Sequence, residues 1–96
     1  VIPCNTAHYW YDDLKKKINL PIINMPQEVF KYTVKKCKKK SKIGLLATEG
    51  TLKTGVYNKF FDKDYHLIYP NTIKSSKIFL DPNLILANSA MKKYNK

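Results

Sequence analysis

The sequence has no arginine, and its 18 basic residues are therefore all lysine. With only seven acidic residues, the chain carries a net charge of +11. Base readout and bidentate phosphate contacts rely heavily on arginine, and charge alone gives only sequence-independent affinity. We therefore interpret the lysines as solvated surface and expect no nucleic-acid partner. A lysine-rich binder of nucleic acid or of an anionic membrane surface is kept as an alternative.

Cysteine, glycine and long apolar runs are also scarce. Two cysteines, Cys4 and Cys37, cannot form a dense disulfide framework, which fits a reducing cytoplasm. No run approaches the ~20 apolar residues of a membrane span, so we expect no membrane insertion. No glycine-rich phosphate loop and no metal-ligand spacing of His, Cys, Asp and Glu is present. We therefore expect neither a nucleotide cofactor nor a metal.

The length of the chain sets a further bound. Its 96 residues suit at most one small domain. The sequence opens on apolar Val1-Ile2-Pro3, without an initiator methionine and without a charged-then-apolar leader. We therefore expect it to be a fragment of a longer protein.

Apolar periodicity predicts alternating strands and helices. Trp10, Leu14 and Ile18 recur at helical spacing, whereas residues 42–47 form the near-continuous apolar run of a buried parallel strand. The predicted strands are 1–3, 20–25, 42–47 and 65–69, and the predicted helices are 6–18, 26–39 and 52–61. This β-α-β-α-β-α-β order predicts an α/β fold with a parallel sheet, whose ligands bind beyond the carboxyl ends of the strands.

Two loops follow predicted strands at that edge of the sheet. Cys4 stands between an apolar run and a helix, where free backbone N–H groups and the helix dipole stabilise a thiolate. Such a thiolate suits a nucleophile or a proton carrier. Residues 48–51 form the second loop. The sheet topology therefore predicts one site built from both loops.

These two loops carry a family resemblance. Residues 4–8 (CNTAH) resemble the first cysteine motif of the cofactor-independent aspartate/glutamate racemases, and residues 44–51 (GLLATEGT) resemble that family's second motif. The resemblance covers roughly residues 1–70. It implies parallel, doubly wound (flavodoxin-like) α/β halves: the end of the first half in 1–41 and the start of the second in 42–70. Residues 71–96 stay unassigned, with a helix expected over 82–93, where Leu84, Ala87 and Met91 form a stripe.

The resemblance also implies roles for the first motif. Cys4 would be one of two acid/base groups that flank the substrate Cα, and Asn5, Thr6 and Ala7 would bind the substrate carboxylate. The alternatives are an inert buried cysteine and helix-capping roles for Asn5 and Thr6.

In the second motif, Thr48 and Thr51 would form the other carboxylate clamp, and Gly50 would let the backbone approach the ligand. The alternative is an ordinary strand-to-helix turn. Glu49, an acid beside an anion site, is expected to point away.

Histidine in the fifth position of the first motif resembles the aspartate racemase branch. His8 would lie one turn into the helix and hydrogen-bond the thiolate or tune its pKa; the alternative is a partly buried helix histidine. His66 is interpreted as structural. The family's second catalytic cysteine, in a Gly-Cys-Thr-Glu motif, is absent, and Cys37 between lysines cannot replace it. We therefore expect this chain alone to be inactive.

The function implied is interconversion of L- and D-aspartate, or a similar acidic amino acid, without pyridoxal phosphate or metal. The intact enzyme is expected to be a cytoplasmic homodimer. Two alternatives stay open: a degenerate, non-catalytic relative that binds acidic amino acids, and a related enzyme acting on maleate, hydantoins or arylmalonates. The threonines of both motifs suit a dicarboxylate without excluding maleate.

Overall fold

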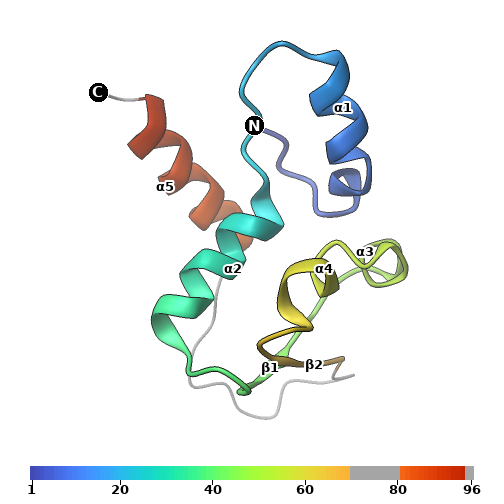
Figure 1. Ribbon diagram of the computed structural model, residues 1–96, viewed down its shortest axis with the longest axis vertical. Helices are drawn as coiled ribbons and strands as arrows, with labels where there is room; N and C mark the ends of the chain where they lie inside the picture. The colour runs from blue at the N-terminus through green and yellow to red at the C-terminus, as the bar shows by residue number, and fades with distance from the viewer. Residues whose placement is uncertain (70–80, 95–96) are drawn as a thin grey trace.

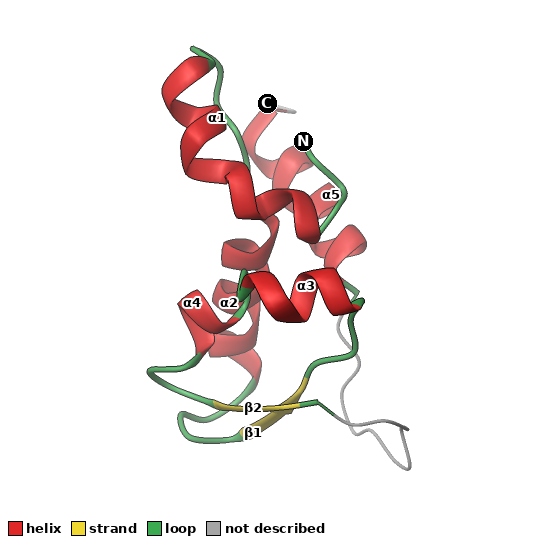
Figure 2. Ribbon diagram, turned by 90° about the vertical axis from the view of Figure 1, so that its right-hand side faces the viewer, coloured by secondary structure: helices red, strands yellow, loops and turns green. Residues whose placement is uncertain are grey.

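A computed structural model describes residues 1–69 and 81–94 of the chain (Figure 1). The elements in chain order are η1 (Thr6–Trp10, a 3₁₀ helix), α1 (Tyr11–Lys17), α2 (Met25–Lys36), β1 (Lys42–Gly44), α3 (Glu49–Thr54), α4 (Asn58–Phe61), β2 (His66–Ile68) and α5 (Pro82–Tyr94). Helix α2 runs through the middle, between α5 and α4. The two strands lie together at one end of the molecule, with the helices stacked above them (Figure 2).

The strands form a parallel pair, which confirms the predicted α/β class. Lys42 pairs with His66 and Gly44 with Ile68. The ladder continues past β1, because the N–H of Leu45 donates to the carbonyl of Ile68 at 2.8 Å. Parallel strands need a long crossover, and α3 and α4 provide it. Both strands are shorter than the predicted 42–47 and 65–69.

Two predicted strands, 1–3 and 20–25, are wrong. Neither pairs with another segment among the described residues, and a strand without a partner leaves its backbone hydrogen bonds unmade. The end of the second segment instead begins a helix. Asn24 caps α2, since its Oδ1 accepts the N–H of Gln27 at 3.0 Å. The apolar run at 20–25 reflects burial of Ile23 and Met25 rather than strand pairing.

The predicted helix 52–61 is two helices. Gly55 has φ of 65°, a left-handed conformation that ends α3, and α4 begins again at Asn58. The predicted helix 6–18 opens as 3₁₀ turns and then becomes α-helical at Tyr11. Gly55 therefore turns the chain within the stretch predicted as one helix.

An aromatic core lies between α2, α4 and the strands. Phe61 is almost fully buried and meets Phe30 edge to face, with ring centroids 5.2 Å apart. The buried members of this cluster are Val29, Val56, Tyr57, Phe61, Tyr65 and Ile85. A second, smaller cluster joins Ile23, Met25 and Leu86, where α5 packs on α2. Burying each such side chain contributes about 1.5–3 kcal/mol, so these clusters stabilise the packing of α2, α4, α5 and the two strands.

Two predicted apolar stripes face solvent instead. Trp10 is 52% exposed, and the first helix buries His8 in its place. Helix α5 occupies the stretch where a helix was expected over 82–93, and Asp81 Oδ1 accepts the N–H of Asn83 at its start. Its stripe is wrong, because Leu84 and Met91 are exposed while Ile85 and Leu86 are buried. A helix face is chosen by the neighbour it meets, here α2.

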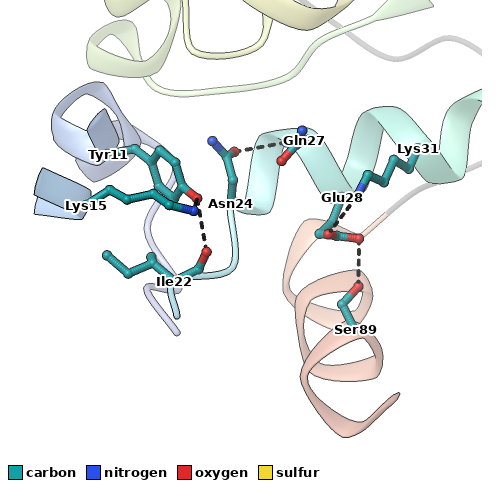
Figure 3. Close-up of polar contacts among 8 residues, drawn as sticks. All are labelled: Tyr11, Lys15, Ile22, Asn24, Gln27, Glu28, Lys31 and Ser89. Atoms are coloured by element: carbon teal, nitrogen blue, oxygen red, sulfur yellow. Dashed lines mark hydrogen bonds and ion pairs between the residues drawn. The ribbon is translucent and has the colours of Figure 1, made fainter. Parts of the chain in front are cut away.

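Polar contacts fix the first turns of α2 against its neighbours (Figure 3). On one side the hydroxyl of Tyr11 donates to the carbonyl of Ile22 at 3.1 Å. On the other, Glu28 accepts from Ser89 of α5 at 3.2 Å and pairs with Lys31 at 3.4 Å. The start of α2 is therefore tied to both ends of the described chain. No helix within residues 1–69 and 81–94 combines the length and apolar character needed to cross a bilayer.

Candidate functional site

Three threonine hydroxyls from the two predicted loops meet at one point. Thr51 Oγ1 lies 3.0 Å from Thr6 Oγ1 and 3.2 Å from Thr48 Oγ1. Thr51 is 3% exposed, so the middle hydroxyl of this threonine cluster is buried, while Thr48 is open to solvent. Thr6 and Thr51 are 45 positions apart in sequence. The predicted meeting of the two loops is therefore present in the structure.

Local sequence explains why the cluster forms. Thr48 is the N-cap of α3, and its Oγ1 accepts the N–H of Thr51 at 3.3 Å. Gly50 lets η1 approach α3, because a Cβ at that position would lie only 3.3 Å from Thr6 Cγ2. Gly50 therefore allows the close approach of Thr6, and the approach of a ligand to Gly50 stays a prediction. Glu49 forms an exposed 2.7 Å ion pair with Lys53 along α3.

The hydroxyl protons of the threonine cluster limit how many hydrogen bonds it can donate to a ligand. Each hydroxyl carries one proton, and the two hydroxyl–hydroxyl bonds use two of the three. When the two bonds run in one direction through Thr51, the O–H of Thr6 or of Thr48 is left to donate outward. The cluster is neutral, so it can hold a carboxylate by hydrogen bonding without placing a fixed positive charge beside it.

Asn5 lies next to this cluster in sequence and is held by a different partner. Tyr57 donates its hydroxyl to Asn5 Oδ1 at 2.7 Å. The side chain of Asn5 makes no capping bond to η1, so the capping alternative is not what the structure shows. Burial raises the pKa of Tyr57, which keeps its hydroxyl protonated and able to donate. Ala7 is half-buried in η1 and adds only its methyl group.

Cys4 is exposed and directly precedes Asn5. It does not follow a strand, contrary to the prediction, because residues 1–3 pair with no other segment. Its backbone carbonyl accepts a hydrogen bond from the ring of His8 at 2.8 Å. Cys37 is elsewhere: it ends α2, is half-buried against the aromatic core, and its carbonyl accepts from Tyr65 at 3.0 Å.

His8 differs from its predicted role. Its Nε2 accepts the backbone N–H of Met25 at 3.1 Å, so the proton sits on Nδ1, which donates to the Cys4 carbonyl. Both ring nitrogens are thus bound to backbone, and neither reaches the thiol. The ring is 6% exposed and stacks near Tyr11. His8 joins the loop of Cys4 to the start of α2, which is the alternative role weighed from the sequence.

Replacing His8 with leucine should lower the free energy of unfolding by about 1–3 kcal/mol. The substitution leaves the buried N–H of Met25 without an acceptor and releases the Cys4 carbonyl. The matched control is His66→Leu, which alters an exposed histidine at the start of β2 and should change stability by less than about 0.5 kcal/mol. Urea unfolding measures both, and equal losses would contradict the assigned role.

A small hollow of about 130 Å³ lies beside the threonine cluster rather than in it. Its lining includes His8, Asn24, Thr54, Lys59 and Phe60. Of the predicted site residues, only His8 lines it, so this hollow is not the predicted carboxylate site. In the described part of the chain, no group of three or more His, Cys, Asp or Glu side chains is placed to hold a metal ion.

Tyr57 is the site residue that sequence reasoning missed. Its position in an apolar stripe beside Val56 and Phe60 indicated only core packing. The signal available was its hydroxyl, because a buried tyrosine usually finds a hydrogen-bond partner.

Several curated proteins are similar to this chain. Glutamate racemase of Aquifex pyrophilus is 40% identical over 60 residues, which cover 62% of this chain and 23% of that protein. The broad specificity amino-acid racemase RacX of Bacillus subtilis (strain 168) is 31% identical over 58 residues, covering 60% and 24%. Glutamate racemase of Oceanobacillus iheyensis is 31% identical over 64 residues, covering 66% and 23%. The chain therefore spans about a quarter of the length of these relatives.

No solved structure matches the chain significantly. The family model described as Asp/Glu/Hydantoin racemase matches residues 1–83, which include both loops, the threonine cluster and the start of α5. This match confirms the resemblance carried by residues 4–8 and 44–51. The chain belongs to the Asp/Glu/hydantoin racemase family.

Proposed function

We propose that this chain is part of a longer racemase that interconverts the enantiomers of an acidic amino acid by cofactor-independent proton transfer. The observation that carries the proposal is the 3.0 Å contact between Thr6 and Thr51, which joins the two loops two positions after the exposed Cys4 in the chain. The first loop thereby carries a thiol at Cys4, an amide at Asn5 and the hydroxyl of Thr6 that contacts the second loop. Its relatives are named as glutamate and broad specificity amino-acid racemases, which supports the reaction class.

In the proposed reaction, the Cys4 thiolate removes the Cα proton from one face of the substrate. A second acid returns a proton to the opposite face, which inverts the centre. Asn5 and the threonine cluster hold a substrate carboxylate, and fixing the substrate in this way limits the reaction to its Cα. Within the described residues the only other cysteine is Cys37, in the aromatic core, so we propose that the second acid comes from another part of the protein.

Aspartate is the substrate we propose first, because histidine in the position of His8 resembles the aspartate branch. The ring of His8 is bonded to backbone on both sides, so its influence on substrate choice acts through the placement of Cys4. Glutamate is the competing substrate, since two of the similar proteins are glutamate racemases. We further propose a homodimer in the cytoplasm, needing neither pyridoxal phosphate nor metal, with residues 1–41 and 42–70 belonging to two α/β halves.

Solvent-deuterium exchange tests the proposal. The intact protein, given each enantiomer of aspartate and glutamate separately in D₂O, should incorporate deuterium at Cα and form the other enantiomer, fastest with aspartate. Residues 1–96 alone should not racemise either substrate, because they contain only one cysteine at the site. Mass spectrometry and chiral chromatography measure both events. Absence of exchange with all four substrates would contradict the racemase proposal, and racemisation by residues 1–96 would contradict the assigned need for a second acid.

A non-catalytic binding protein is the second candidate. It is favoured by one observation. The described residues contain the whole threonine cluster, but they place no second cysteine beside it. Binding of aspartate by the intact protein without any Cα exchange would establish this candidate. Turnover of maleate or a hydantoin in place of amino acids would instead identify a related enzyme of the same family.

A further inference from the structure

We infer that Tyr57 is a positioning residue that fixes the side-chain amide of Asn5 with its NH₂ group turned toward the substrate carboxylate. This inference rests on the proposed function and assigns it a residue outside both sequence motifs.

The contact is short and well anchored. The hydroxyl of Tyr57 lies 2.7 Å from Asn5 Oδ1, across 52 positions of sequence. Tyr57 is 3% exposed, and its ring packs on Phe61 with centroids 6.0 Å apart. Its backbone carbonyl accepts the N–H groups of Phe60 and Phe61, each at 3.0 Å. The ring of Tyr57 is therefore enclosed by the core, whereas Asn5 is only half-buried.

The direction of the hydrogen bond decides what Asn5 presents. In the structure the hydroxyl of Tyr57 donates to the amide oxygen of Asn5. The amide NH₂ group then points away from Tyr57, and among the described residues the side-chain hydrogen bond of Asn5 uses its oxygen rather than its NH₂ group. Two N–H donors are thus available to a carboxylate. If the amide turned over, its oxygen would face the carboxylate and repel it.

Asn5 and Thr6, two consecutive residues of the first motif, are each hydrogen-bonded to a residue that lies far along the chain. Thr6 is held by Thr51 of α3, and its neighbour Asn5 is held by Tyr57, which directly precedes α4. The turn at Gly55 separates these two holding groups and directs them to adjacent residues. The first motif is thus oriented at two consecutive positions by the segment that follows the second motif.

The test is Tyr57→Phe in the intact protein, with Tyr65→Phe as the matched control. Tyr65 is a buried tyrosine of the same core whose hydroxyl bonds to the backbone carbonyl of Cys37, away from the threonine cluster. Tyr57→Phe should raise KM for the acidic amino acid roughly 3- to 10-fold, the effect of losing one neutral hydrogen bond, with kcat changed less than about twofold. Tyr65→Phe should leave KM unchanged although both variants lose a buried hydroxyl.

A double-mutant cycle separates positioning from packing. In an Asn5→Ala background, Tyr57→Phe should change KM by less than about twofold, because there is no amide left to orient. An unchanged KM in Tyr57→Phe, or the same increase in the Asn5→Ala background, would overturn the inference while leaving the racemase proposal intact. A wild-type protein that neither turns over nor binds acidic amino acids would overturn both.

Discussion

Replacing Cys4 with alanine should lower kcat/KM for racemisation by a factor between about 10² and 10⁴, the usual contribution of a positioned acid or base. Cys4 is exposed and precedes Asn5 and Thr6 in the chain, so the substrate Cα is proposed to sit against its thiol. Cys4→Ser should be nearly as damaging, because a hydroxyl gives up its proton far less readily than a thiol. Chiral chromatography of aspartate incubated with each variant measures the loss.

The chain contains its own control for this experiment. Cys37→Ala removes the other thiol, which is half-buried against the aromatic core at the end of α2. Its racemase activity should stay within about twofold of wild type, with a modest loss of stability from the smaller side chain. Comparable losses of activity in Cys4→Ala and Cys37→Ala would contradict the assignment of Cys4, since both would then act through the fold.

Thr51→Val should combine a loss of stability with a loss of substrate affinity. Valine has the shape of threonine without the hydroxyl, so both bonds of the buried Thr51 Oγ1 are removed and Thr6 and Thr48 lose their common partner. At about 0.5–1.5 kcal/mol for each hydrogen bond, unfolding free energy should fall by about 1–3 kcal/mol. KM should rise about 10-fold as the outward O–H loses its fixed direction. Urea unfolding and initial rates measure the two effects.

Thr33→Val provides the comparison for Thr51→Val. Thr33 is equally buried, but its hydroxyl donates to the carbonyl of Val29 within α2, at 2.8 Å. Its loss should lower stability by a similar or smaller amount and leave KM unchanged. An increase in KM in both variants would show that destabilisation alone weakens substrate binding, and the threonine cluster would then have no special role.

The sequence predicted the elements whose signals are local. Apolar periodicity indicated a helix after residue 51, and the structure has α3 and α4 there, although α3 begins at Glu49, within the predicted loop. The apolar run at residues 42–47 indicated a parallel strand, and β1 pairs with β2 in parallel. Strands 1–3 and 20–25 could not be judged in this way, because a strand exists only with a partner. The break at Gly55 was missed because its apolar neighbours continue a helical stripe across the turn.

At the site, the sequence likewise indicated which residues take part but not which partners they contact. The motifs identified Thr6, Thr48 and Thr51, whose hydroxyls do meet. They did not reveal that His8 uses both ring nitrogens on backbone, since its partner Met25 lies in a segment predicted to be a strand. Tyr57 was missed for a related reason: its partner is 52 positions away, and no periodicity reports such a contact.

The first turns of the chain are attached to the rest by hydrogen bonds more than by apolar packing. Neither hydrophobic cluster of the described residues includes a side chain from the first 18 positions. Contacts of Asn5, Thr6 and His8 to Tyr57, Thr51 and Met25 hold that segment in place. Such a segment can open as a unit while the aromatic core stays folded, at a free energy well below that of global unfolding. The thiol would then be lost from the site long before the protein denatures, and a bound substrate that bridges both loops would oppose this local opening.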